Sequence, residues 1–136
     1  MPYETIAHKV LKNGELIGHR PAYYEKDGDA WAATTWREYA DQVRAAAKSL
    51  IALGVEPGAV VTILGANRPE WTIVDVAAMA AGAVPAGIYA TNSPAECRYI
   101  VEHSEAPIVL VENQALCDKI AQVRELIPTL RHVVMM

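Results

Sequence analysis

Three groups of side chains in this sequence have types and spacings that could carry out chemistry. The first is the turn Leu64-Gly65-Ala66-Asn67, between an apolar run and a helical pattern, which is where a doubly wound α/β fold holds a phosphate. Only one glycine of the G-x-G-x-x-G pattern is present, and Glu70 follows in the first helical turn, where its charge would repel a phosphate. We therefore favour a capped turn over a nucleotide site at this position.

The other two groups are a pair of carboxylates and a set of tryptophans. Glu70 and Asp75 could form an acid/base pair, but a separation of five residues does not place them on one helix face. Trp31, Trp36 and Trp71 could line an acyl pocket with the tyrosines, although Trp36 and Trp71 each stand at a predicted helix start, where packing is the commoner role. Neither a G-x-S-x-G nucleophile pattern nor a G-x-x-x-x-G-K-[ST] phosphate loop occurs.

The cysteines and histidines do not suggest a metal site. Cys97 and Cys117 do not form a C-x-x-C pair and fall in helix-like segments, so we interpret them as buried, reduced thiols of a cytosolic protein. The histidines have no metal-ligand spacing with one another or with the cysteines; they are His8, His19, His103 and His132. The sequence therefore predicts no catalytic, cofactor-binding or metal-binding residue.

The composition excludes several classes of protein. A hydrophobic content of 52% with 21% charged residues is typical of a folded domain and not of a disordered chain. The net charge of −4 and the scattered basic residues argue against nucleic-acid binding. The N-terminus has no signal-peptide pattern, and the longest apolar stretch, 76–90, is too short and too interrupted by glycine and proline to span a bilayer.

The elements that would position these residues follow from periodicity and capping patterns. A short helix over 5–12 is predicted to end at Asn13-Gly14, and a hairpin is predicted over 21–35. Thr35 forms a capping box with the glutamate three residues later and opens a long helix, which Gly54 ends.

Beyond Gly54, four apolar runs alternate with three helical patterns, whose first residues include the capping candidates Asn67, Ser93 and Asn113. Continuous apolar runs are typical of parallel strands buried on both faces, and their alternation with helices implies right-handed crossovers. The predicted fold is a three-layer α/β domain, a mostly parallel sheet with helices on both faces, preceded by the hairpin. The strands are 59–64, 83–89, 108–111 and 131–136, and the helices are 67–81, 93–103 and 113–127.

The chain divides into an N-terminal helical lead-in, residues 1–20, and an α/β subdomain, residues 21–136. Because the sequence stops within the apolar strand Val133-Val134-Met135-Met136, we expect the subdomain to be a truncated piece of a larger domain. Uncovered strand edges and apolar surface tend to find a partner. We therefore expect the chain to be a homo-oligomer, most simply a two-fold dimer.

Five segments, in this order and at these spacings, resemble the N-terminal region of AMP-forming long-chain fatty acid–CoA ligases, which are acyl-CoA synthetases of the adenylate-forming superfamily. The resemblance covers residues 21–136. One departure is Ala59, after Pro57-Gly58, where the family commonly has an aspartate. The segments are Thr35-Trp36-Arg37-Glu38-Tyr39, Leu53-Gly54-Val55-Glu56-Pro57-Gly58, Asn67-Arg68-Pro69-Glu70-Trp71, Ala81-Gly82-Ala83-Val84-Pro85 and Ile88-Tyr89-Ala90-Thr91-Asn92-Ser93.

The resemblance implies a parent enzyme that activates a fatty acid with ATP and Mg²⁺ to an acyl-adenylate and transfers the acyl group to CoA. The family's phosphate-handling loop, its Tyr-Gly-x-Thr-Glu stretch, its ribose-binding aspartate and its catalytic lysine match nothing in residues 1–136. We therefore carry over no catalytic, cofactor-binding or metal-binding residue, and expect the chain alone to be inactive, with no bound cofactor.

The cysteines and the short apolar stretch predict a cytoplasmic protein without a transmembrane segment, and peripheral membrane contact stays open. The residues are also compatible with two other classes of protein: a free-standing α/β nucleotide-binding module, and a structural or interaction domain. The coding sequence just beyond Met136 would distinguish them. A Thr/Ser/Gly-rich loop with a lysine favours the ligase, whereas a stop codon favours a standalone module.

Overall fold

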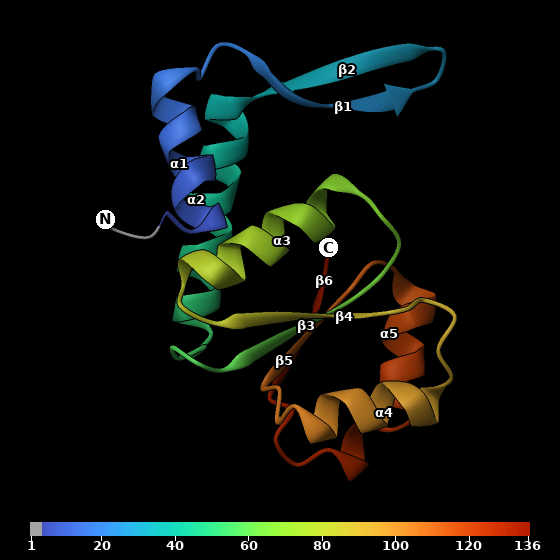
Figure 1. Cartoon of the computed structure of the whole chain (residues 1–136). Coiled ribbons are helices and arrows are strands. Elements are labelled where there is room, and N and C mark those ends of the chain that lie inside the picture. The colour runs from blue at the N-terminus through green and yellow to red at the C-terminus, as the bar shows by residue number, and fades with distance from the viewer. Residues whose placement is uncertain (1–3) are drawn as a thin grey trace.

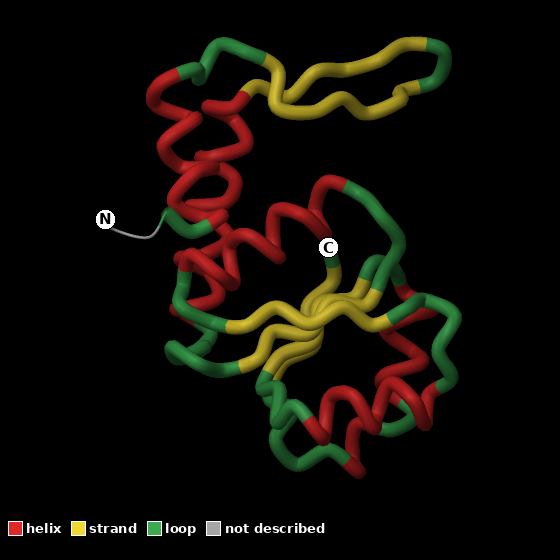
Figure 2. The backbone as a smooth tube through the Cα atoms, in the orientation of Figure 1, coloured by secondary structure: helices red, strands yellow, loops and turns green. Residues whose placement is uncertain are grey.

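The computed structural model describes residues 4–136 and contains an N-terminal helical and hairpin region followed by an α/β sheet (Figures 1 and 2). Helix α1 (Ile6–Leu16) precedes the hairpin of β1 (Pro21–Asp27) and β2 (Ala30–Thr35), which leads into helix α2 (Trp36–Ala52). Strands and helices then alternate in the order β3 (Val60–Leu64), α3 (Pro69–Ala80), β4 (Val84–Ile88), α4 (Pro94–His103), β5 (Ile108–Val111), α5 (Gln114–Ala121), the 3-10 turn η1 (Arg124–Leu126) and β6 (His132–Met135).

The four strands β3 to β6 form one parallel sheet in the order β4-β3-β5-β6. Helices α1, α2 and α3 lie on one face of this sheet and α4 and α5 on the other (Figure 1). β4 pairs with one edge of β3, and the chain then crosses over to form β5 along the opposite edge of β3. The predicted three-layer α/β fold, with its hairpin and parallel sheet, is confirmed.

The strands are continuously apolar because both faces of the sheet are buried. Val61 and Ile63 belong to a core shared with α1, α2 and α3, whereas Leu64 belongs to a second core under α4 and α5. Thr62 is fully buried in the same strand, and its hydroxyl donates to the carbonyl oxygen of Ile108 at 2.9 Å. That hydrogen bond removes the cost of burying a hydroxyl among apolar groups.

Helix α2 begins and ends as predicted. The Thr35 hydroxyl accepts from the amide of Glu38, and the Glu38 carboxylate accepts from the amide of Thr35 at 2.8 Å. At the other end Gly54 has φ +81°, a left-handed conformation that glycine adopts without a steric penalty. The amides of Gly54 and Val55 then donate to carbonyls of the last helical turn, which closes the helix.

The predicted end of the first helix at Asn13-Gly14 is wrong, because α1 continues to Leu16. Gly14 is buried against α2, and a Cβ at this position would lie only 2.5 Å from the Cβ of Ala40. The glycine therefore serves close helix packing inside the helix. Local turn propensity predicted a helix end, and tertiary contact with α2 overrides it.

Two other helix boundaries differ from the prediction. Asn67 does not cap α3; Arg68 is the N-cap residue and makes no side-chain capping bond, although Pro69 stands in the first turn as predicted. The helix predicted to reach residue 127 ends at Ala121 and tightens into η1. The buried positions Val123 and Ile127 continue the apolar spacing of α5 through this tighter turn, so periodicity alone does not reveal the change.

Candidate functional site

The crevice at the carboxyl ends of β3 and β5 is the place where this fold would hold a ligand. From β3 the next strand, β4, is added on one side, and the following strand, β5, is added on the other side. Open α/β sheets bind ligands at such a topological switch point. Two loops meet there, 65–68 after β3 and 112–113 after β5. The turn singled out from the sequence therefore lies at the expected location.

A carboxylate of the chain itself fills this crevice. Glu112 Oε2 accepts a hydrogen bond from the amide of Ala66 at 2.7 Å. A Cβ at Gly65 would lie 3.0 Å from the Cβ of Glu112, so the small residue admits the glutamate chain. Arg68 lies nearby, with its Nη1 3.9 Å from Glu112 Oε1. The amide that would bind a phosphate oxygen already has a negatively charged partner.

Glu70 and Asp75 lie in different environments and share no hydrogen bond among the described residues. Arg68 binds the Glu70 carboxylate through two nitrogens, at 2.7 and 3.0 Å. This side-chain hydrogen bond lowers the pKa of Glu70 from its ordinary value, with a smaller contribution from the amide of Glu70 itself. Burial instead raises the pKa of Asp75. The arrangement therefore gives Glu70 an ion-pair role at the start of α3.

The three tryptophans do not meet in one pocket. Trp31 on the hairpin is 65% exposed, and Trp36 packs at the start of α2, 6.0 Å from the Tyr39 ring. Trp71 lines a cavity of about 270 Å³ at the ends of β3 and β4, where a Cβ at Gly87 would lie 3.0 Å from its ring. Only Trp71 therefore borders a cavity at the carboxyl edge of the sheet.

Lys119 holds the loop between β4 and α4. Its Nζ donates to the carbonyl oxygens of Ala90 and Asn92, both at 2.7 Å. The next residue, Ser93, caps α4 in the predicted capping box with Glu96. The sequence predicted no role for Lys119, because the carbonyl groups that it binds lie 29 and 27 residues away along the chain and no local pattern links them to it. This lysine fixes a loop at the same edge of the sheet, beside the 80%-exposed Tyr89.

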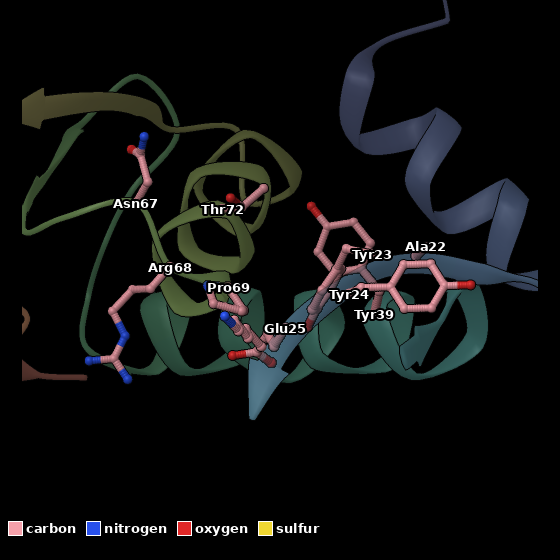
Figure 3. Close-up of a pocket in the computed structure, with 10 residues that line it drawn as sticks. Ala22, Tyr23, Tyr24, Glu25, Tyr39, Asn67, Arg68, Pro69 and Thr72 are labelled. Carbon is pink, nitrogen blue, oxygen red and sulfur yellow. The ribbon is translucent and has the colours of Figure 1, made fainter. Parts of the chain in front are cut away.

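A second hollow of about 580 Å³ lies between β1 and the start of α3 (Figure 3). Tyr23 and Tyr39 meet edge to face with ring centres 5.5 Å apart, and the Tyr23 hydroxyl donates to Gln42. Burial, with smaller contributions from Tyr23 and Asp75, raises the pKa of Tyr39 to about 12. The tyrosines gather toward one end of the hollow and Arg68 lies at the other. Its lining residues include no cysteine, serine or histidine.

Residues 4–136 contain no group of three histidine, cysteine, aspartate or glutamate side chains that could hold a metal ion. No helix among these residues is long and apolar enough to cross a membrane. The loops at the carboxyl edge of the sheet are held by the hydrogen bonds of Glu112 and Lys119.

The comparison with known families decides the family. The model of the family described as AMP-binding enzyme matches residues 13–136. The chain belongs to the AMP-binding enzyme family. The match includes the hairpin, the whole α/β sheet and helices α2 to α5, but only the end of α1, and it extends beyond the region in which the sequence motifs occur.

Two relatives place the chain within the AMP-binding enzymes. A long-chain-fatty-acid–CoA ligase, ACSBG2 of Xenopus laevis, is 40% identical over 134 residues, which are 98% of this chain and 18% of the relative. The ligase FadD15 of Mycobacterium bovis is 40% identical over 131 residues, 96% of this chain and 22% of the relative. The resemblance to this ligase branch is confirmed, and the chain spans about a fifth of the length of these relatives.

The fold agrees with solved AMP-binding enzymes at lower sequence identity. The anthranilate CoA ligase AuaEII, solved with anthranoyl-AMP, superposes with a TM-score of 0.86 at 23% identity; the match covers 100% of this chain and 26% of that protein. The described elements therefore adopt the arrangement that they have within a much larger enzyme.

Proposed function

We propose that the complete protein is an AMP-forming long-chain fatty acid–CoA ligase. It would activate a fatty acid with ATP and Mg²⁺ to an acyl-adenylate, and then transfer the acyl group to CoA. The observation that supports this most directly is the 40% identity to long-chain ligases from two distant organisms over almost the whole chain. The ordered motifs from Thr35 to Ser93 support the same branch.

The residues of this chain do not fit the phosphates of ATP at the sheet crevice. The Glu112 carboxylate already accepts the hydrogen bond of the Ala66 amide, and Glu70 adds a second carboxylate at the start of α3. Both carboxylates lie beside Arg68, the cation that could otherwise neutralise a phosphate at this position. We therefore propose that ATP and Mg²⁺ are bound by parts of the enzyme other than this crevice.

The chain by itself is proposed to be inactive. Adenylyl transfer depends on groups that position the reactants and neutralise developing charge, and the described residues contain no cluster of histidine, cysteine, aspartate or glutamate that could hold a metal ion. Its contribution would be a rigid wall whose loops 65–68, 89–93 and 112–113 border the rest of the enzyme. The free thiols Cys97 and Cys117 support a cytoplasmic location.

The test compares two polypeptides from the same gene. The chain of 136 residues and the longest open reading frame that contains it are each incubated with ATP, magnesium and palmitate, and pyrophosphate release is measured. CoA consumption is then followed separately. We expect turnover from the longer protein and a buffer-level rate from the chain.

The acid substrate is varied in the same assay. Turnover by the longer protein with benzoate or acetate in place of palmitate would refute the long-chain assignment. Turnover by the chain of 136 residues would refute its proposed inactivity. A reading frame that stops at Met136 would favour the alternative of a free-standing binding or interaction module.

A further inference from the structure

The turn that follows β4 is held from one side by α5, beside which the connection from β4 to α4 passes (Figure 1). The amide of Asn92 donates to the carbonyl oxygen of Tyr89 at 3.0 Å, which closes the turn over 89–92. The carbonyl oxygens of Ala90 and Asn92 take no part in that hydrogen bond, and the Lys119 ammonium donates to both at 2.7 Å. Lys119 therefore ties the turn to α5 at two points.

Lys119 is suited to hold this turn. Its neighbours Leu116 and Ile120 are buried in the core under α4 and α5, so the helix that carries the lysine is itself fixed. The ion pairs found among residues 4–136 do not include Lys119, so its charge is directed to the two carbonyl groups. Hydrogen bonds from an ammonium are stronger than those between neutral groups. Without this lysine, two partly buried residues, Ala90 and Asn92, would lose the partner of their carbonyl oxygens.

Tyr89 is the side chain whose place depends most on the turn. Ile88, the residue before it, is buried, whereas Tyr89 is exposed and belongs to neither core. Its ring therefore takes its position from the backbone of the turn. With Trp71 and Gly87 it lines the cavity of about 270 Å³ at the carboxyl ends of β3 and β4. The same turn thus carries the two oxygens that Lys119 binds and one wall of this cavity.

We propose that Lys119 is a positioning residue of the ligase reaction, which acts by holding Tyr89 at the wall of this cavity. This role rests on the proposed function, because it requires that a substrate of the complete enzyme contacts Tyr89. Open α/β sheets bind ligands outside the carboxyl ends of their strands, which is where the cavity lies. A misplacement of about 1 Å can cost roughly 100-fold in rate. A turn released from α5 would therefore slow the reaction although Lys119 itself touches no substrate.

The cavity suits an uncharged part of a substrate. The described residues that line it carry no charged side chain. Gly65 in the lining lies against the side chain of Glu112, whose carboxylate would repel a phosphate group nearby. The phosphates of ATP are therefore not the group that Tyr89 would contact, and a displaced Tyr89 should leave the KM for ATP unchanged.

Hydrogen exchange of the complete protein tests whether Lys119 holds the turn. Lys119→Met removes the ammonium at similar side-chain length, and amides in a peptide spanning 89–96 should then exchange about tenfold faster than in the wild type. Lys119→Arg keeps the charge and should stay within about threefold of the wild type. Lys48→Met removes an exposed lysine of α2 and is the matched control. Unchanged exchange in Lys119→Met would overturn the proposal, as would faster exchange that extends to β3, because that would indicate general destabilisation.

A double-mutant cycle in the complete enzyme tests whether Lys119 acts through Tyr89. ATP is saturating, and palmitate and CoA are each kept below their KM, so that a weaker contact with either substrate appears in the rate. Lys119→Met and Tyr89→Ala should each lower the rate of acyl-CoA formation about tenfold. In the Tyr89→Ala background, Lys119→Met should lower it further by less than about twofold, because the group through which it acts is already absent.

Multiplicative losses in the double variant would overturn the proposal, because a lysine that only stabilises the fold lowers the rate equally in both backgrounds. A wild-type rate in either single variant would also overturn it, as would a loss that appears only in the KM for ATP. A wild-type enzyme that forms no acyl-CoA would instead refute the proposed function.

Discussion

The replacement Gly14→Ala sets helix propensity against helix packing. In an exposed helix interior this change stabilises by about 1 kcal/mol, because alanine restricts the unfolded backbone more than glycine does. Here the new Cβ would lie 2.5 Å from the Cβ of Ala40 and 3.2 Å from the carbonyl oxygen of Trp36. Carbon atoms in contact normally lie about 3.5–4.0 Å apart, so α1 and α2 must separate by about 1 Å.

Overpacking of this kind costs about 1–3 kcal/mol. After the gain in propensity is subtracted, we expect Gly14→Ala to lower the free energy of unfolding by about 1–2 kcal/mol. The compensating exchange Gly14→Ala with Ala40→Gly moves the methyl group from one helix to the other. It should recover at least about 1 kcal/mol relative to the sum of the two single changes.

Urea denaturation followed by circular dichroism measures all four proteins of this cycle at one concentration, low enough for each to be monomeric. A midpoint for Gly14→Ala at or above the wild-type value would refute the packing argument, because propensity alone predicts that sign. Additive effects of the two substitutions would also contradict direct contact between the two positions.

Three further outcomes are expected. Hydrogen bonds from the N-cap residues lower the pKa values of Glu38 and Glu96. The stability that these carboxylates contribute is therefore present above the unfolded pKa of about 4.3 and is lost as pH falls through the lower folded pKa values. Urea titrations between pH 6 and 3 should show a smaller loss of unfolding free energy for Glu38→Gln than for wild type. Glu105 has φ +52° at the end of α4, and Glu105→Gly should raise the free energy of unfolding by about 1 kcal/mol; a lower midpoint would contradict this. Burial raises the pKa of the Cys97 thiol, so a thiol reagent at pH 8 should modify the partly exposed Cys117 first; equal rates for the two thiols in the folded chain would contradict this.

The sheet and most helix ends could be predicted because their signals are local. Four apolar runs, the capping boxes at Thr35 and Ser93, and the glycine after Leu53 each act within a few residues, and each lies where it was predicted. Gly14 could not be interpreted this way. Its role depends on Ala40 in another helix, and a single sequence does not reveal which residues of two helices touch.

The contents of the crevice were likewise beyond the reach of local patterns. The position of the turn after β3 was predicted, yet the carboxylate that occupies it comes from Glu112, 46 residues further along the chain. Lys119 is similar, since the loop carbonyls that it binds lie 27 and 29 residues away. Spacing rules describe neighbours within an element, whereas these contacts follow from strand order.

The strand order also has a consequence for synthesis of the chain on the ribosome. β3 is the first strand of the sheet to be made and lies between β4 and β5. Its neighbour β5 is made only after β4 and α4. Between residues 88 and 111, at about 5–20 residues per second, roughly 1–5 s pass. Throughout that interval the nascent chain would present the unpaired apolar edge of Val61–Leu64, and a chaperone that shields extended apolar segments would have its main opportunity to bind then.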